Sequence, residues 1–212
     1  MVNSMKILVL ATDTQKEEWL AQSAPGNDSI TWVDNISEIA NNNADIIIDL
    51  LFEEQPEHAT ALAQSNASLV IINAVTQTRA GLPSHFVRIN GWPTFLERTI
   101  IEASGDKALQ EQTISVFSTL NKQIAWVADH PGFISARIIA MIINEAYLAL
   151  EENVSSKEEI DIAMKTGTNY PYGPFDWAEK IGVSKINRLL NALSQQEKRY
   201  KPAALLTQEA AQ

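Results

Sequence analysis

The feature that most constrains the fold of this chain is the stretch of residues 129–177, which opens on a Pro-Gly break. Pro131-Gly132 ends whatever element precedes it. Residues 133–152 then carry apolar side chains at spacings of three and four, a pattern that predicts a helix. Because the apolar positions spread around nearly the whole helix, we expect it to be buried between domains or between subunits.

Two shorter helices are predicted after the long one. The run of residues 155–159, Ser-Ser-Lys-Glu-Glu, predicts a serine N-cap with a glutamate that reaches back to it, and Gly167 is expected to end that helix. Residues 170–174 predict a turn, and Pro174 suits the first position of a further short helix. The region therefore reads as an all-helical domain.

These motifs resemble the C-terminal domain of the 3-hydroxyacyl-CoA dehydrogenase family. The family's Asp-x-Pro-Gly-Phe-Ile opening matches residues 129–134, and its Asn-Glu-Ala run matches residues 144–146. Its Ile-Asp-x-Ala-Met and Gly-x-x-Tyr-Pro-x-Gly-Pro-Phe runs match residues 160–164 and 167–175, and Arg137 sits where the family has its arginine. The resemblance implies a Rossmann domain before this one, a two-fold dimer through this domain, and NAD-dependent oxidation of a 3-hydroxyacyl-CoA.

The first part of the chain alternates aliphatic runs with helical patterns, which predicts a parallel, doubly wound sheet. Strands are expected at residues 6–11, 29–34, 44–52, 68–73, 86–90, 99–103 and 124–128, and helices at 14–21, 56–64 and 107–121. The predicted fold class is α/β, with a reduced Rossmann-like domain at residues 1–128 followed by an all-α C-terminal domain at residues 129–212. The Ala/Gln-rich end, residues 203–212, is expected to be a frayed tail.

The cofactor loop that the resemblance implies is degenerate. The three glycines of the family's loop fall on Ala11, Asp13 and Lys16. A diphosphate needs bare backbone at a helix N-terminus, and a side chain at the second glycine position blocks that approach. A carboxylate there also repels phosphate. We therefore expect NAD as the cofactor by family resemblance, with binding weak or lost.

The acid that would bind the adenosine ribose corresponds to Asp34, at the end of the second predicted strand. An aspartate at the end of a strand is also common simply because it favours a turn. Ribose binding and a purely structural role in the turn therefore both stay open for Asp34. The long helical excursion with which the family contacts CoA is reduced here to residues 35–43, so CoA recognition has no support from the resemblance.

The catalytic pair of the family falls on Asn90 and Glu102. The family uses a histidine as general base and, twelve residues later, a glutamate that orients it. Here Glu102 occupies the glutamate position, whereas the base position holds Asn90, whose amide cannot accept and carry a proton. Supporting amides of the family become Pro93 and Ala136. His130, at the expected domain junction, is the candidate substitute base, and the alternative is that it caps or packs at the Pro-Gly break.

The other polar and aromatic candidates have structural interpretations. We expect His58 to be solvated, His85 to lie in an exposed loop, and the acidic pairs at 53–54 and 158–159 to start helices or face solvent. The acidic residues Asp45, Asp49 and Glu102 could suggest a metal site. They are expected on strands, without a further ligand at a suitable spacing, so no metal site is expected. The aromatic residues Trp92, Phe95 and Trp177 could line a cleft, but core packing is the favoured interpretation.

Composition excludes several partners. A net charge of −10 argues against nucleic acid and acidic membranes, and zero cysteines exclude disulfides and thiol catalysis. No apolar run reaches the length of about 18 residues that a membrane span needs, and no signal-peptide pattern opens the chain. A cytoplasmic protein is expected.

Three functional hypotheses stay open. The first is a divergent family member that keeps the scaffold and the dimer without the dehydrogenase mechanism, with a cleft for a small acyl or acid ligand. The second is a working dehydrogenase with His130 as base, and the third is a non-catalytic assembly subunit. We expect a homodimer through the C-terminal helices that buries Ile138, Ile142 or Ala149. The alternative is that these side chains pack only against the chain's own Rossmann domain.

Overall fold

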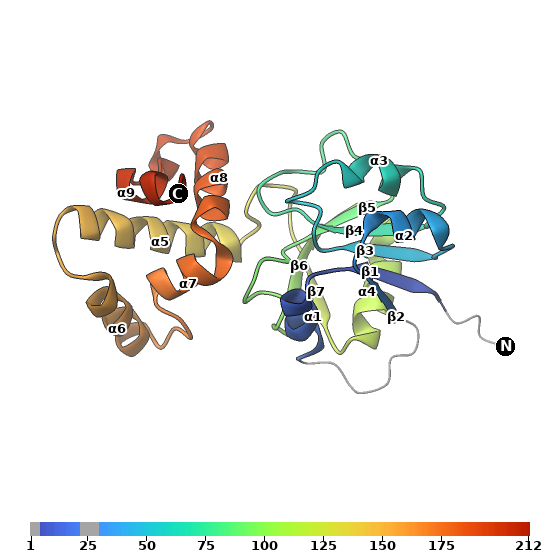
Figure 1. Ribbon diagram of the computed structural model, residues 1–212, viewed down its shortest axis with the longest axis horizontal. Helices are drawn as coiled ribbons and strands as arrows, with labels where there is room; N and C mark the ends of the chain where they lie inside the picture. Colours follow the sequence, from blue (N-terminus) through green and yellow to red (C-terminus); the bar gives the residue numbers. More distant parts are fainter. Residues whose placement is uncertain (1–4, 22–29) are drawn as a thin grey trace. The chain divides into compact units, whose positions relative to one another are not determined.

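The computed structural model describes residues 5–21 and 30–212, and the chain divides into two compact units, Met1–Phe133 and Ile134–Gln212. We call these units the sheet domain and the helical domain (Figure 1). The sequence placed the boundary a few residues earlier, between residues 128 and 129. The first residue of the second expected strand, Ser29, lies outside the described residues.

The sheet domain contains one seven-stranded sheet, in the order β2-β1-β3-β4-β5-β6-β7. Its strands are β1 (Ile7–Leu10), β2 (Ile30–Val33), β3 (Ile46–Asp49), β4 (Leu69–Asn73), β5 (Phe86–Ile89), β6 (Ile100–Ser104) and β7 (Gln123–Trp126). Its helices are α1 (Asp13–Leu20), α2 (Ile36–Asn41), α3 (His58–Ala63), the 3-10 helix η1 (Lys107–Leu109) and α4 (Gln110–Thr119). The predicted α/β fold class is confirmed.

One strand pair departs from the predicted parallel sheet. β5 and β6 pair antiparallel, with Arg88 opposite Ser104 and Ile89 opposite Ala103, whereas the other neighbouring strands run parallel. Only residues 90–99 separate the two strands, and a parallel connection needs a crossover of about a dozen residues or more. The short connection therefore forces the chain to turn back on itself at this point.

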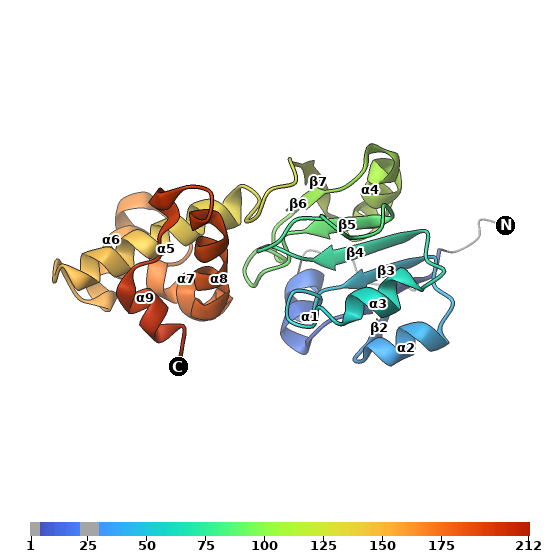
Figure 2. The ribbon, with the colours of Figure 1, turned by 90° about the horizontal axis from the view of Figure 1, so that it is seen from above.

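Helices cover both faces of the sheet, as the aliphatic strands require. Trp19 of α1 and Phe117 of α4 pack on one face, with ring centroids 5.4 Å apart. Ile39 of α2 and Leu62 of α3 pack on the other face. Figures 1 and 2 show the two pairs of helices on opposite sides of the strands. Strands buried on both faces explain the near-continuous aliphatic runs in the sequence.

The helix α2 was not predicted, since no element was assigned to residues 35–43 from the sequence. Asn35 caps α2, and its side chain accepts a hydrogen bond from the Ser37 backbone at 2.8 Å. The helix predicted at residues 107–121 forms in two pieces, as η1 and then α4.

The helical domain contains α5 (Ser135–Glu151), α6 (Lys157–Thr168), α7 (Pro174–Ile181), α8 (Val183–Ser194), the 3-10 helix η2 (Lys198–Tyr200) and α9 (Ala204–Glu209). The predicted capping box forms at α6, between Ser156 and Glu159. The prediction that Gly167 ends α6 is wrong, because the helix continues to Thr168 and ends at Asn169, whose φ of 56° is left-handed. The helix α8 was not predicted.

The expected frayed tail is also wrong, because it forms α9. Leu206 is fully buried, and the Leu205 backbone donates to Glu151 of α5 at 2.7 Å. Lys157 of α6 forms an ion pair with Glu209 at 2.8 Å. Composition indicated a tail, but one buried leucine and these long-range contacts hold the segment in place.

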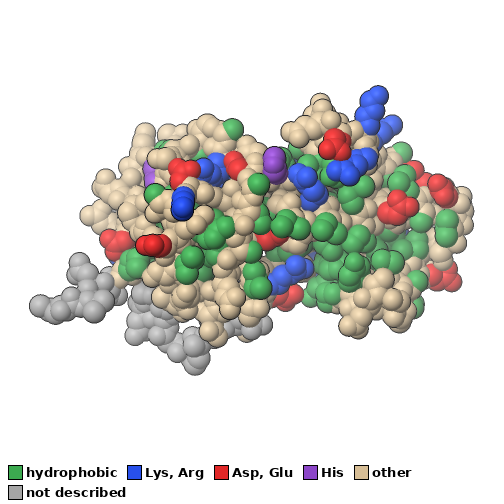
Figure 3. All heavy atoms as spheres, turned by 180° about the vertical axis from the view of Figure 1, so that it is seen from behind, with side chains coloured by type: hydrophobic (Ala, Val, Ile, Leu, Met, Phe, Trp, Pro, Cys, Tyr) green, Lys and Arg blue, Asp and Glu red, His purple; other side chains and the backbone are tan. Residues whose placement is uncertain are grey.

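The long helix α5 is buried along one side within the chain. Its buried side includes Ile139, Ala140 and Ile143, whereas Ile134 and Ile138 are 56% and 52% exposed. Hydrophobic side chains gather on one face of the helical domain in Figure 3. The chain alone therefore does not provide the all-round burial that the pattern of α5 predicts. Among the described residues, no helix is both long and apolar enough to cross a membrane.

Candidate functional site

The antiparallel turn between β5 and β6 brings Asn90 and Glu102 together. The Asn90 backbone donates to the Glu102 carbonyl at 3.0 Å, and its side-chain Nδ2 donates to Glu102 Oε2 at 3.2 Å. Asn90 is 2% exposed, and Glu102 is half-buried. The spacing of twelve residues thus places the two side chains of the expected catalytic pair in direct contact. The arrangement is an amide–carboxylate pair, in which the amide at the base position donates to Glu102 and cannot itself accept a proton from a substrate hydroxyl.

Three charged side chains, two of them buried and one half-buried, fix the segment that follows Asn90. Glu53 accepts from Trp92 Nε1 at 2.6 Å, and it also accepts from the Thr76 backbone at 2.6 Å. Glu18 of α1 accepts from the Thr94 backbone with both carboxylate oxygens, at 3.1 and 3.0 Å. Thr94 has a φ of 72°, which a β-branched residue rarely adopts. The contact with Glu18 holds this strained residue in place.

The third charged side chain is Lys122, which is 2% exposed. Its Nζ donates to the carbonyls of Leu96 and Arg98, at 2.5 and 3.0 Å. Burial lowers the pKa of Lys122 to about 8, and the carboxylates of Glu18 and Glu97 partly oppose that shift. The lysine was not singled out in the sequence, since a Lys in a turn usually reaches solvent.

We expect the stability of the protein to rise between pH 8 and pH 10 because of Lys122. Its pKa in the folded chain is lowered to about 8, so in this range the unfolded chain binds more protons than the folded chain, and the free energy of unfolding increases with pH. The gain should be about 2 kcal/mol, and K122M should lack it. Urea unfolding of both proteins at pH 7.5 and 10 measures the difference. If the free energy of unfolding changed equally with pH in the wild type and K122M, Lys122 would not be the cause of the rise.

The turn between β1 and α1 forms a closed helix cap. Thr12 Oγ1 accepts from the Gln15 backbone at 3.2 Å, and Gln15 Oε1 accepts from the Thr12 backbone at 3.0 Å. Gln15 Nε2 then donates to the Leu50 carbonyl at 2.9 Å, and the same carbonyl accepts from Asn73 Nδ2 at 3.2 Å. The chain's own side chains therefore occupy the carboxyl ends of β1, β3 and β4, where doubly wound sheets bind ligands.

The expected cofactor residues lie around this cap. Ala11 precedes it, Asp13 is exposed in the first turn of α1, and Lys16 lies over the Trp32 ring at 5.3 Å. Asp34 is exposed after β2, and its backbone donates to Glu38 at 3.3 Å. The placement of Asp34 fits the turn interpretation at least as well as ribose binding.

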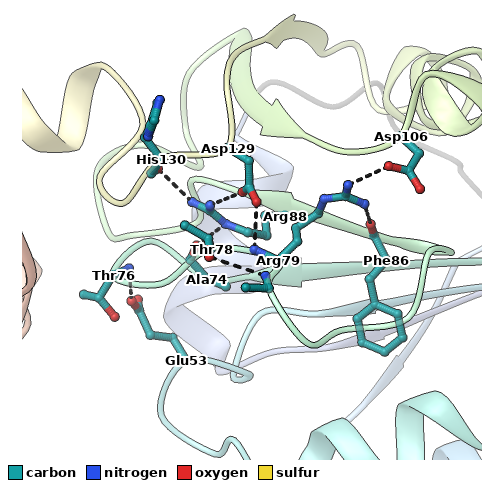
Figure 4. A network of polar contacts seen from close by, with 11 residues as sticks. Glu53, Ala74, Thr76, Thr78, Arg79, Phe86, Arg88, Asp106, Asp129 and His130 are labelled. Carbon is teal, nitrogen blue, oxygen red and sulfur yellow. Dashed lines mark hydrogen bonds and ion pairs between the residues drawn. The ribbon is translucent and has the colours of Figure 1, made fainter.

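Figure 4 shows the network around Arg88, which holds the segment that contains His130. Arg88 is fully buried, and its guanidinium donates to Asp129 at 2.5 Å, to the Ala74 carbonyl at 2.9 Å and to the His130 carbonyl at 3.3 Å. Burial lowers the pKa of Arg88, and the nearby Asp129 carboxylate opposes that effect. His130 contributes its backbone to the network, whereas its imidazole is exposed and points away from it (Figure 4).

The environments predicted for three polar residues are wrong. His58 is 3% exposed, and its Nδ1 lies 2.7 Å from Oδ2 of the fully buried Asp49. Burial raises the pKa of Asp49, and the contact with His58 opposes that shift. Glu53 is buried, and His85 is half-buried with its ring against Phe86. No local sequence pattern predicts the contacts of these residues, because their partners come close only in the folded sheet domain.

The interpretation of the aromatic residues agrees with the structure. The aromatic residues Trp92, Phe95 and Trp177 are buried, as the core interpretation predicts. In the part of the chain that the structure describes, no group of three or more His, Cys, Asp or Glu side chains could hold a metal ion.

The motif residues of the helical domain have structural contacts. Asp161 accepts from the backbones of Phe175 and Asp176, at 2.8 and 2.9 Å, and so caps α7. Gly173 lies so close that a Cβ there would be 2.2 Å from Asp161 Cγ. Asn144 of α5 accepts from the Ala203 backbone at 2.8 Å and donates to the Lys201 carbonyl at 3.1 Å. These motifs therefore specify the packing of the helices.

Comparison with known proteins supports the resemblance. The family model for the 3-hydroxyacyl-CoA dehydrogenase C-terminal domain matches residues 132–211. A 3-hydroxybutyryl-CoA dehydrogenase of Bradyrhizobium diazoefficiens is 33% identical over 158 residues, which are 72% of this chain and 53% of that protein. A 3-hydroxyadipyl-CoA dehydrogenase of Escherichia coli is 47% identical over 91 residues, which are 42% of this chain and 19% of that protein. The chain therefore spans about half the length of the Bradyrhizobium relative and about a fifth of the length of the E. coli relative.

Solved structures share the fold. The (S)-3-hydroxybutyryl-CoA dehydrogenase PaaH1 of Ralstonia eutropha superposes with a TM-score of 0.73 at 19% identity, covering 97% of this chain and 93% of that one. M. tuberculosis FadB2 superposes with a TM-score of 0.74 at 15% identity, covering 96% and 92%. At these identities the likeness concerns the arrangement of helices and strands.

Proposed function

The chain belongs to the 3-hydroxyacyl-CoA dehydrogenase family, and from this premise we propose that it is a divergent member without the family's dehydrogenase mechanism. The observation that carries the proposal is the pair formed by Asn90 and Glu102. Its geometry is that of a base and its orienting acid, but the side chain at the base position is an amide that donates to the acid. Oxidation of an alcohol requires a base that accepts the hydroxyl proton, and the amide of Asn90 at the base position cannot act as one.

The cofactor site supports the same proposal. Diphosphate binding at a helix N-terminus uses free backbone N–H groups and close backbone approach. Here the capping box of Thr12 and Gln15 uses two of the N–H groups at the start of α1, and Asp13 adds a negative charge. The residues present do not fit a dinucleotide diphosphate, so we propose that NAD binding is weak or lost.

An active dehydrogenase with His130 as base is the less favoured alternative. The imidazole of His130 is exposed and points away from the Arg88 network (Figure 4). A ligand that reached Asn90 would meet the half-buried carboxylate of Glu102, so a neutral acyl group fits this environment better than an acid. An acidic chain without cysteine also suits a cytoplasmic setting.

Assembly is the role that we propose for the retained helical domain. A hollow of about 360 Å³ on α5 and η2 is lined mainly by apolar groups, including Ile138, Met141 and Ile142. Arg137 and Glu145 lie at the same face, so opposite charges can meet across a two-fold contact. A non-catalytic subunit that pairs with a catalytic relative is the alternative role for this domain.

We expect a homodimer that a single charge on this face disrupts. The wild type should show about twice the chain mass of 23.5 kDa in light scattering at micromolar concentration. Ile138→Glu should give a monomer, because a two-fold contact carries each substitution twice. The control is Ile162→Glu on α6, since Ile162 is exposed to a similar extent, 59% against 52%. A monomeric wild type, or equal dimers in both variants, would contradict this interface.

A further inference from the structure

A groove on the helical domain differs from the apolar face of α5 in both place and charge. It has a volume of about 570 Å³ and lies between α5, α6, α7 and α9. Its floor includes the rings of Tyr147 and Phe175, which meet edge to face with centroids 5.0 Å apart. Ile162 of α6 is at its edge and is 59% exposed. Both rings are buried, at 1% and 8% exposed, so the apolar surface that the chain leaves uncovered at the groove comes from Ile162.

The rim of this acidic groove carries excess negative charge. Five carboxylates and two lysines line it, and both lysines are already paired, Lys157 with Glu209 and Lys165 with Asp176, each at 2.8 Å. Asp161 is occupied by the backbone of α7. The negative charge that an incoming partner meets therefore comes from the exposed carboxylates of Glu158 and Glu179.

The floor of the groove already holds a cation. Lys157 Nζ lies 5.3 Å from the centroid of the Tyr147 ring and 5.2 Å from that of Phe175, within the range of cation–π attraction. A second hollow, of about 360 Å³, shares Lys157 and Glu209 with the groove and extends it past Leu205, which is 37% exposed. Apolar contacts therefore continue along the surface, with carboxylates beside them.

We propose that the acidic groove docks an amphipathic helix of a partner protein that carries lysine or arginine beside its apolar residues. Charge complementarity selects this occupant. A second copy of the chain has a net charge of −10 and is repelled by an acidic rim, whereas the face at Ile138 has charges of both signs. The proposal does not depend on the loss of dehydrogenase activity.

The test uses a fluorescently labelled peptide of about five helical turns, built from leucine and lysine in an amphipathic pattern, and its counterpart with glutamate for lysine. Fluorescence anisotropy with the full chain should give a dissociation constant of about 1–100 µM for the lysine peptide and no binding of the glutamate peptide. The variant E158K/E179K should weaken binding roughly tenfold or more.

A matched control separates a specific groove from general attraction to an acidic protein. E17K/E111K makes the same change in charge at two exposed positions of the sheet domain, and it should change the affinity less than about twofold. Equal losses in both variants, an unchanged affinity in E158K/E179K, or no saturable binding would overturn the proposal. Self-association that E158K/E179K abolishes would assign the groove to a second copy and would also overturn it.

Discussion

Turnover of 3-hydroxybutyryl-CoA with NAD is expected to be undetectable, or lower than in active family members by a factor of about 10²–10⁴, the usual contribution of a positioned base. The physical reason is the pair at the end of β5. Asn90 donates to Glu102 at 3.2 Å, and an amide nitrogen has no lone pair that can accept the hydroxyl proton. Steady-state NADH absorbance with the purified chain measures this rate.

Reversion of the base position should not restore activity. Asn90→His rebuilds the base beside Glu102, but it leaves the closed cap at Thr12 and Gln15, where a diphosphate would have to bind. His130→Ala serves as the matched control for the substitute-base hypothesis. Wild-type turnover of several per second that His130→Ala abolishes would make His130 the base and would contradict the proposed loss of mechanism.

The helical domain should be strongly destabilised when one methyl group is added at Gly173. A Cβ at this position would lie 2.2 Å from Asp161 Cγ, so Gly173→Ala has to displace the carboxylate that caps α7. We expect a loss of about 3 kcal/mol in the free energy of unfolding. Urea unfolding followed by circular dichroism measures it.

The matched control is the other glycine of the same motif. Gly167 lies in α6 with nothing within 4 Å of an added Cβ, so Gly167→Ala should stabilise the helix by about 0.5–1 kcal/mol. The two identical substitutions are therefore expected to act in opposite directions. Similar effects at both positions would show that the contact between Gly173 and Asp161 does not determine the packing of α7.

The α/β architecture could be predicted because its signals are local. Aliphatic runs such as Ile7–Leu10 mark strands buried on both faces, and the capping box of Ser156 and Glu159 marks the start of α6. The direction of β6 was missed, although the short connection from β5 excludes a parallel crossover. The tail was missed because the burial of Leu206 depends on α9 packing in the helical domain rather than on composition.

The candidate site was only partly predictable. The family resemblance located the pair of Asn90 and Glu102, and the two side chains meet because Asn90 directly follows β5 and Glu102 lies on β6, after one short loop. The charged partners of that loop were not found, since Glu18 is 76 residues from its partner Thr94. His58 was expected to be solvated because its own segment is polar, whereas its burial depends on Asp49 at the end of β3.

The loss of the cofactor site is the central claim, and calorimetric titration of the purified chain with NAD tests it most directly. Asp13 and Lys16 stand at two glycine positions, and the start of α1 is closed by its own capping box. The account predicts a dissociation constant in the millimolar range or weaker, or no measurable heat. A constant of about 10–50 µM, corresponding to a binding free energy of about −6 to −7 kcal/mol, would contradict it and would restore NAD-dependent dehydrogenation as the leading interpretation.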